Sequence, residues 1–212
     1  MTPLPPRGLY AITDGPHPAL LEQVRQALAG GARIVQYRDL SADHSRRLAE
    51  AHALQRACAE HGVPLLINGD AALAQAVGAA GVHLGETTED LASARARLGP
   101  TAIIGVSCFA SLERAQAMVA AGASYVSFGA FFPSTTLPHA RLAPIALLRQ
   151  SATLGVPRVA IGGITPDNGA PLVDAGADYL AAIAAVFGVT DVRAAAQRFA
   201  DLYRSPSSEP SR

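Results

Sequence analysis

The sequence predicts a closed (β/α)8 barrel, a single domain over residues 1–204. At 212 residues, half of them hydrophobic, the chain has the size of a one-domain barrel and can bury a large core. Eight short runs rich in Val, Ile, Leu and Tyr recur, each followed by a polar turn and a stretch with helical spacing. Strands that are apolar on both faces and alternate with helices favour a parallel sheet, and eight regular units favour its closure over the alternative, an open doubly wound sheet.

The predicted elements alternate along the whole chain. The strands cover residues 8–13, 33–38, 64–68, 81–85, 102–107, 125–131, 158–164 and 179–184. Between them lie segments such as ALLEQVRQALAGG, SLERAQAMVAAGA and NGAPLVDAGA, whose apolar residues recur at three and four. Each of these segments contains a Gly near its end, as helices often do. The last residues, 205–212, have the composition of a disordered tail.

Composition excludes several classes of function. Acidic residues balance the arginines, no lysine occurs, and no basic cluster indicates nucleic-acid binding. The N-terminus lacks the apolar run of a signal peptide, and no stretch has the length and apolarity of a membrane span. Cys58 and Cys108 have the spacing of neither a disulfide framework nor a metal-ligand pair. We therefore expect a cytoplasmic protein that binds neither membrane nor nucleic acid; its oligomeric state is unknown.

In a barrel of this kind the chemistry lies at the C-terminal ends of the strands. Gln36 and Arg38 alternate by two and so share one face of their strand. An inward Arg needs an anion, either the phosphate of a ligand or a carboxylate of the protein. Asn68 and Ser107 end two other strands, where each either recognises a heterocycle or caps the next helix. His83 lies within a strand, as a hydrogen-bonded core residue or as a base.

A phosphate site is predicted after the last two strands. The adjacent glycines Gly162 and Gly163 allow backbone amides to approach an anion, and the loops after strands seven and eight hold phosphate in many barrels. The alternative is that the glycine pair only permits a tight turn. Asp167 or Asn168 is expected to cap the following helix. The hydroxyls at 134–136 either hold a phosphate or solvate a surface turn.

These motifs together resemble the thiamine phosphate synthase family and its relative, the thiazole tautomerase group. The fragments are LYAITD, VQYRD, LLIN-x-D, GVHLG, IIGVSC, FGAFFPSxT and VAIGGIT, in that order along nearly the whole chain. The resemblance implies a (β/α)8 barrel that joins hydroxymethylpyrimidine pyrophosphate to a thiazole phosphate, forming thiamine phosphate and pyrophosphate. It also implies Mg²⁺ as the ion that holds the pyrophosphate. Such a transferase of thiamine biosynthesis supplies positioning and charge neutralisation rather than a nucleophile.

The resemblance assigns roles to individual positions. Arg38 and Ser107 are the expected catalytic residues. The expected substrate-binding residues are Gln36, Arg38, Asn68 and Ser107 on the pyrimidine side and Ser134, Thr136, Gly162, Gly163, Ile183 and Ala184 on the thiazole phosphate side.

The chain departs from the family pattern at four charged positions. The family's two magnesium ligands are aspartates, and Gly69 and Thr88 stand in their places; nearby Asp70 and Glu86 are the candidate substitutes. Two lysines of the family are replaced by Leu40 and Leu137. A synthase with weakened activity is therefore the main expectation.

Two other functions remain open alternatives. A tautomerase-like isomerase would lack the family's His, because Ala130 stands there, and would use His83 or His139 instead. A non-catalytic binder of a phosphorylated heterocycle is the other.

Overall fold

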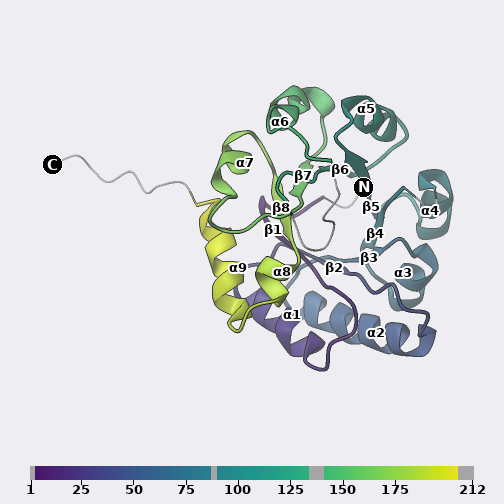
Figure 1. Ribbon diagram of the computed structural model, residues 1–212. Helices are drawn as coiled ribbons and strands as arrows, with labels where there is room; N and C mark the ends of the chain where they lie inside the picture. Colours follow the sequence, from purple (N-terminus) through teal and green to yellow (C-terminus); the bar gives the residue numbers. More distant parts are fainter. Residues whose placement is uncertain (1–2, 87–89, 134–140, 205–212) are drawn as a thin grey trace.

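The eight predicted strands form a closed parallel barrel (Figure 1). The structure, a computed structural model, describes residues 3–86, 90–133 and 141–204. Each strand pairs with its neighbours in sequence, and β8 pairs with β1 to close the sheet, with Leu9 opposite Leu180. The predicted fold class is thus confirmed. The strands are β1 (Gly8–Ile12), β2 (Ile34–Tyr37), β3 (Leu65–Asn68), β4 (Gly81–Leu84), β5 (Ile103–Phe109), β6 (Tyr125–Phe128), β7 (Arg158–Ile161) and β8 (Tyr179–Ala182).

Helices surround the barrel in a ring (Figure 1). They are α1 (Leu20–Ala29), α2 (His44–Glu60), α3 (Ala71–Val77), α4 (Leu91–Leu98), α5 (Leu112–Ala120), α6 (Ala146–Gln150), a 3-10 turn (Ala152–Leu154), α7 (Ala170–Asp174), α8 (Ala184–Phe187) and α9 (Val192–Asp201). Several of them begin at a side chain that accepts a hydrogen bond from a first-turn N–H, which fixes where the helix starts. These caps are Asp43, Asp70, Asp90, Ser111 and Asp191.

One helix start differs from the prediction. Neither Asp167 nor Asn168 caps α7, which begins after Gly169 without a side-chain cap. Asn168 instead accepts a hydrogen bond from the N–H of Thr165 at 2.8 Å and donates one to the carbonyl of Gly163 at 3.0 Å. The side chain is used to close the turn after β7, so it is not available to the helix.

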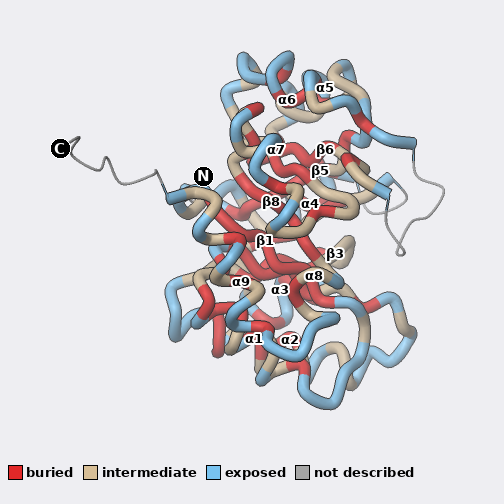
Figure 2. Tube along the Cα trace, turned by 60° about the vertical axis from the view of Figure 1, so that its left-hand side comes forward, coloured by how far each residue is buried: buried red, intermediate tan, exposed pale blue. Residues whose placement is uncertain are grey.

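Three apolar clusters hold the barrel together. Two of them fill the space between the strands and the surrounding helices, and the third fills the interior of the barrel. Figure 2 shows the buried strands as the central part of the molecule, with exposure concentrated on the outer helices and loops. Inside the barrel Gly105 makes room for Tyr125, because a Cβ at Gly105 would lie 1.8 Å from Cζ of that ring.

The helices and the cysteines were also compared with the sequence-based expectations. None of the helices in the described ranges has the length and hydrophobicity needed to cross a bilayer. Cys58 and Cys108 are buried and free. Residues 205–212, predicted to be a disordered tail, lie outside the described residues.

Candidate functional site

A small cavity at the C-terminal mouth of the barrel collects the polar residues predicted for the pyrimidine side. Its volume is about 140 Å³. Its lining includes residues from β2, β3 and β5: Gln36 and the following Arg38, Asn68, and Ser107. Ile183 also lines it. The other lining residues are Tyr10, Ile12, His83, Ser127, Val159, Ile161 and Ala181. Residues 36 to 107 are distant in sequence, and closure of the barrel is what brings them together.

A chain of hydrogen bonds crosses the barrel beneath this cavity. Nε2 of Gln36 donates to the Tyr10 hydroxyl at 2.6 Å, and the hydroxyls of Tyr10 and Tyr125 lie 2.8 Å apart. The Tyr125 hydroxyl also meets Nδ1 of His83 at 2.9 Å, and Nε2 of His83 meets Oγ of Ser107 at 2.9 Å. The rings of His83 and Tyr125 are stacked, with centroids 5.7 Å apart. The chain ends at the cavity wall.

Burial determines the protonation states of the histidine and the tyrosines in this hydrogen-bond chain. Desolvation lowers the pKa of His83 to about 4, so the imidazole is neutral at pH 7. Burial also raises the pKa of Tyr10 and of Tyr125 well above the usual value, so both hydroxyls keep their protons. With both ring nitrogens bonded and a low pKa, His83 is a poor general base, which answers the question left open about its role.

Two polar side chains face the cavity without a bond of their own. Among the described residues, neither Asn68 nor Ser127 has a side-chain hydrogen-bond partner in the structure, although Ser127 is only 4% exposed. Neither Asn68 nor Ser107 caps a helix, because Asp70 caps α3 and Ser111 caps α5. Both side chains face the cavity with unused hydrogen-bonding capacity, Asn68 partly exposed and Ser127 buried, so they are available to a ligand.

Arg38 follows β2 at the mouth, and its backbone is fixed by the end of β1. The N–H of Arg38 donates to Oγ1 of Thr13 at 2.9 Å, and the carbonyl of Arg38 accepts from the N–H of Gly15 at 2.9 Å. Its guanidinium forms an ion pair with Asp14, whose side chain is 51% exposed. Arg38 therefore lines the cavity and has a carboxylate partner, as one of the two interpretations requires, and its contact with the phosphate of a ligand stays a prediction.

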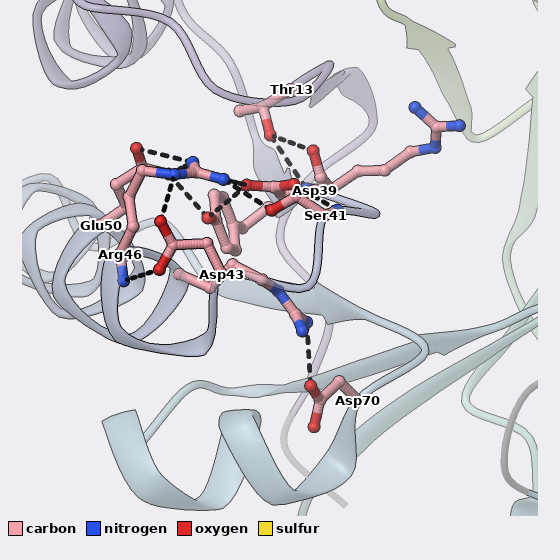
Figure 3. Close-up of polar contacts among 10 residues, drawn as sticks. Thr13, Asp39, Ser41, Asp43, Arg46, Glu50 and Asp70 are labelled. Carbon is pink, nitrogen blue, oxygen red and sulfur yellow. Dashed lines mark hydrogen bonds and ion pairs between the residues drawn. The ribbon is translucent and has the colours of Figure 1, made fainter.

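The loop between β2 and α2 is fixed by a buried carboxylate (Figure 3). Asp39, whose side chain is 1% exposed, accepts hydrogen bonds from Arg46 at 2.7 Å and from the N–H of Ser41 at 2.8 Å. Arg46 also contacts Glu50 at 3.0 Å, and Glu50 accepts from the Tyr37 hydroxyl at 2.7 Å. Leu40, between these anchors, is 71% exposed.

A larger cavity of about 770 Å³ adjoins the small one. The two share Ser107, Ser127 and Ile161 on their walls, and the larger is also lined by Gly129 and Gly162. The remaining lining residues are Phe109, Ala110, Ser111, Ala130, Arg141, Leu142 and Pro144. Two spaces of unequal size that share part of their walls have room for two ligands side by side.

The predicted phosphate-side residues are only partly described. Gly162 and Gly163 have φ of +101° and +63°, and a Cβ on Gly163 would lie 2.3 Å from the carbonyl oxygen of Pro133, so the tight turn itself requires glycine. Ile183 precedes the short helix α8, and Ala184 begins it. Ser134 and Thr136 lie outside the described residues, as do Leu137 and His139.

The described residues do not form a magnesium site. Asp70 uses both carboxylate oxygens, one of which accepts from the N–H of Leu73 at 2.8 Å. The other accepts from Arg47 at 2.9 Å, the contact drawn at Asp70 in Figure 3. Glu86 is exposed, and Thr88 falls outside the described residues. Within the described ranges no three His, Cys, Asp or Glu side chains are grouped as metal ligands would be. The structure therefore does not bring the predicted ligands Asp70 and Glu86 together around an ion.

These observations define a (β/α)8 barrel with a cavity of polar and apolar lining at its C-terminal mouth, the usual place of the active site in barrel enzymes. Comparison with known proteins narrows the class. Residues 9–186 match the family model described as thiamine monophosphate synthase. The chain belongs to the thiamine monophosphate synthase family.

Curated relatives and solved structures agree with this membership. A thiamine-phosphate synthase of Chromobacterium violaceum is 52% identical over 93% of this chain and 97% of its own length. One from Xanthomonas campestris pv. campestris is 54% identical over 91% of this chain and 94% of its own. A thiamine phosphate pyrophosphorylase structure from Pyrococcus furiosus has 34% identity and a TM-score of 0.83, covering 92% of this chain and 94% of that one. The resemblance inferred from the motifs is confirmed.

Sequence reasoning missed three residues of the site. Tyr10, Tyr125 and Ser127 line the small cavity or support it, yet each lies inside an apolar run and was not singled out from it. The period-two alternation of a strand places Tyr125 and Ser127 on one face, which is a signal that the sequence does contain. That a hydroxyl at such a position meets another across the barrel is not visible in the sequence.

Proposed function

We propose that this protein joins hydroxymethylpyrimidine pyrophosphate to a thiazole phosphate, giving thiamine phosphate and pyrophosphate. The observation that carries the proposal is the convergence of Gln36, Arg38, Asn68 and Ser107 on one small cavity. Relatives about half identical to this chain over nearly its full length carry the name thiamine-phosphate synthase. Such a reaction needs two substrates at one mouth, and the two adjoining cavities fit that need.

The pyrimidine substrate is assigned to the small cavity. Gln36, Asn68 and Ser107 offer neutral hydrogen bonds, which suit a heterocycle, and the apolar lining by Ile12 and Ile183 suits its faces. Arg38 offers a cation to the pyrophosphate at the edge of the same space. These residues position the substrate and stabilise charge as the pyrophosphate leaves, without forming a covalent bond to it.

The thiazole phosphate is assigned to the larger cavity and the turn after β7. Gly162 lines that cavity, and Gly163 follows it in a turn that brings backbone close to the mouth. With Ile183 and Ala184 at the start of α8, these are the loops in which barrels commonly hold phosphate. Ser134 and Thr136 complete the proposed thiazole phosphate side.

The family uses magnesium, and this chain offers it a poor site. Our prediction for a displaced ion remains Asp70 and Glu86. To ligate an ion, Asp70 would have to leave Arg47 and the first turn of α3, and helix caps typically contribute about 0.5–2 kcal/mol. We therefore assign no step of the reaction to a metal and expect low activity with a weak dependence on magnesium.

Calorimetry and product analysis of the full chain test this function. The protein is titrated with hydroxymethylpyrimidine pyrophosphate and with thiazole phosphate, each with and without magnesium, and the mixture is assayed for thiamine phosphate. Arg38→Gln is expected to weaken binding of the pyrophosphate substrate by about tenfold or more, because a charge-assisted hydrogen bond contributes about 1.5–3 kcal/mol. Arg198→Gln, which breaks another Arg–Asp pair on the outer surface of α9, is the matched control.

Either of two outcomes contradicts the proposal. Absence of thiamine phosphate under all conditions, with thiazole phosphate still bound, would leave a binder or an isomerase. Equal losses for Arg38→Gln and Arg198→Gln would remove the small cavity from the binding site. We also propose a cytoplasmic location, with which the free thiols Cys58 and Cys108 are compatible.

A further inference from the structure

The hydrogen-bond chain from Gln36 through Tyr10, Tyr125 and His83 ends at Ser107, and its polarity determines what the site presents to a ligand. We propose that the chain runs in one direction, from Gln36 to Ser107, so that Tyr10, Tyr125 and His83 are positioning residues that aim the Ser107 hydroxyl hydrogen into the small cavity. The part of this inference that concerns the ligand rests on the proposed function. The part that concerns the direction of the chain does not.

The direction is set at its first bond. The amide nitrogen Nε2 of Gln36 donates to the Tyr10 oxygen at 2.6 Å, and an amide nitrogen cannot accept. Tyr10 has one hydrogen of its own. The other side-chain partner of its hydroxyl in the described structure is the Tyr125 hydroxyl at 2.8 Å, so Tyr10 donates there.

The same reasoning fixes the tautomer of His83. Tyr125, having accepted from Tyr10, has its hydrogen left for Nδ1 of His83 at 2.9 Å. A neutral imidazole carries one hydrogen, and it must then be on Nε2. Nε2 donates to Oγ of Ser107 at 2.9 Å.

Ser107 is left with one unused hydrogen at the cavity wall. Its oxygen accepts from His83, and its side chain has no other hydrogen-bond partner among the described residues. The ligand atom that meets Ser107 is therefore an acceptor, either a ring nitrogen of a pyrimidine or an oxygen of a phosphate. With the opposite polarity Ser107 would donate to His83 and present only lone pairs, and the site would select a donor instead.

Nitrogen-15 NMR of the histidine rings tests the direction in the full-length protein without ligand. The protein has six histidines, and the NMR signals of His83 are identified by their loss in the variant His83→Gln. We expect the Nε2–H tautomer for His83 at pH 7. Finding the hydrogen on Nδ1 would overturn the proposal outright, because that tautomer requires the reversed chain.

A pair of tyrosine variants tests the positioning role. Tyr125→Phe removes the donor to Nδ1 and is expected to convert the single tautomer of His83 into a mixture. Tyr179→Phe is the matched control, since Tyr179 is also a barrel tyrosine but its hydroxyl donates to the carbonyl of Pro5, outside this chain. An unchanged tautomer in Tyr125→Phe would overturn the role of Tyr125. If that variant does not fold, Tyr10→Phe is used, with a shift in the same direction expected.

Two simple probes identify the acceptor. Binding of hydroxymethylpyrimidine without phosphate, and of inorganic pyrophosphate, is measured for wild type and Ser107→Ala. Loss of one hydrogen bond is expected to weaken the binding of one of the two probes by about tenfold. Which probe is affected distinguishes a ring nitrogen from a phosphate oxygen as the acceptor. Ser151→Ala, which removes a buried hydroxyl bonded to the carbonyl of Leu148, is the control and is expected to change neither.

The failures of this proposal and of the proposed function can be told apart. If Ser107→Ala binds both probes as tightly as wild type, the donor role of Ser107 is wrong, whatever the protein catalyses. If wild type binds neither probe, the proposed function and the ligand part fail together, and the tautomer of His83 still decides the direction of the chain.

Discussion

Replacing Asp39 with Asn tests whether the β2–α2 loop depends on a buried ion pair. The Asp39 side chain is 1% exposed and accepts from Arg46 at 2.7 Å and from the N–H of Ser41 at 2.8 Å. Asn keeps an oxygen for Ser41 but loses the charge that faces Arg46. Removing one partner of a buried pair costs about 3–5 kcal/mol. Arg46 is 27% exposed and keeps Glu50, so we expect a loss below that range, about 2–3 kcal/mol, roughly one charge-assisted hydrogen bond.

Urea denaturation of the full chain at pH 7 measures this loss as a lower midpoint with an unchanged slope. Asp201→Asn is the control, because its pair with Arg204 is at least half exposed on both sides and is expected to change stability by less than about 0.5 kcal/mol. A change of that small size for Asp39→Asn would refute the reasoning.

The same pair makes a prediction about pH. Burial alone would raise the pKa of Asp39, but the N–H of Ser41 and the guanidinium of Arg46 together outweigh it, so the pKa lies below its usual 3.8. A carboxyl whose pKa is lowered on folding stabilises the protein above the unfolded pKa. That contribution should decline as pH falls through about 4 and below, and Asp39→Asn should lose this part of the acid sensitivity.

Three further predictions concern the mouth and the barrel interior. Gly105→Ala would place a Cβ 1.8 Å from Cζ of Tyr125, so we expect a loss of at least about 1–3 kcal/mol in urea denaturation, and a wild-type midpoint would contradict the packing. Burial lowers the pKa of His83 to about 4, so the unfolded chain binds a proton that the folded one does not, and stability should fall as pH drops from 6.5 toward 4 by up to about 1.4 kcal/mol per pH unit. In His83→Gln this slope should be reduced, and an identical slope would show that His83 is not its source. Asp14→Asn frees Arg38 from a half-exposed partner and is expected to tighten pyrophosphate binding about two- to fivefold by calorimetry, the size of a surface pair; weaker binding would contradict a role for Arg38.

The barrel was predictable because its signal is repeated. Each strand is a short apolar run and each helix a period of three and four, so an error at one boundary does not change the topology. Most predicted strands run beyond the observed ends, by the largest margin at 125–131 and 158–164, because Gly129 and Gly162 continue the apolar pattern after the backbone has left the sheet; β5 is the exception and extends two residues past its predicted end, to Phe109.

The lining of the small cavity was predictable where a polar residue lies at or near the C-terminal end of an apolar strand, as Gln36, Asn68 and Ser107 do. It was not predictable where a residue has two possible partners. Asn68 was equally suited to cap α3, and only the structure shows Asp70 in that role. Asp70 was also the carboxylate proposed as a ligand of a displaced ion, and as the cap of α3 its side chain is already in use. The spacing of residues in the sequence does not reveal this conflict.

The ion pairs near the mouth differ in how readily they can be exchanged for a ligand. Arg46 is held by the buried Asp39, and Arg47 by Asp70 at the start of α3, so withdrawing either arginine would leave a carboxylate without its partner inside the protein. Asp14 is half exposed, and water can replace Arg38 around it at a cost of about 0–1 kcal/mol. Of these three arginines only Arg38 also lines the small cavity. If the small cavity binds the pyrophosphate substrate as proposed, Arg38 is the one of these three arginines that can turn to it at low cost, and with leucine at position 40 Arg38 has more of the negative charge to neutralise.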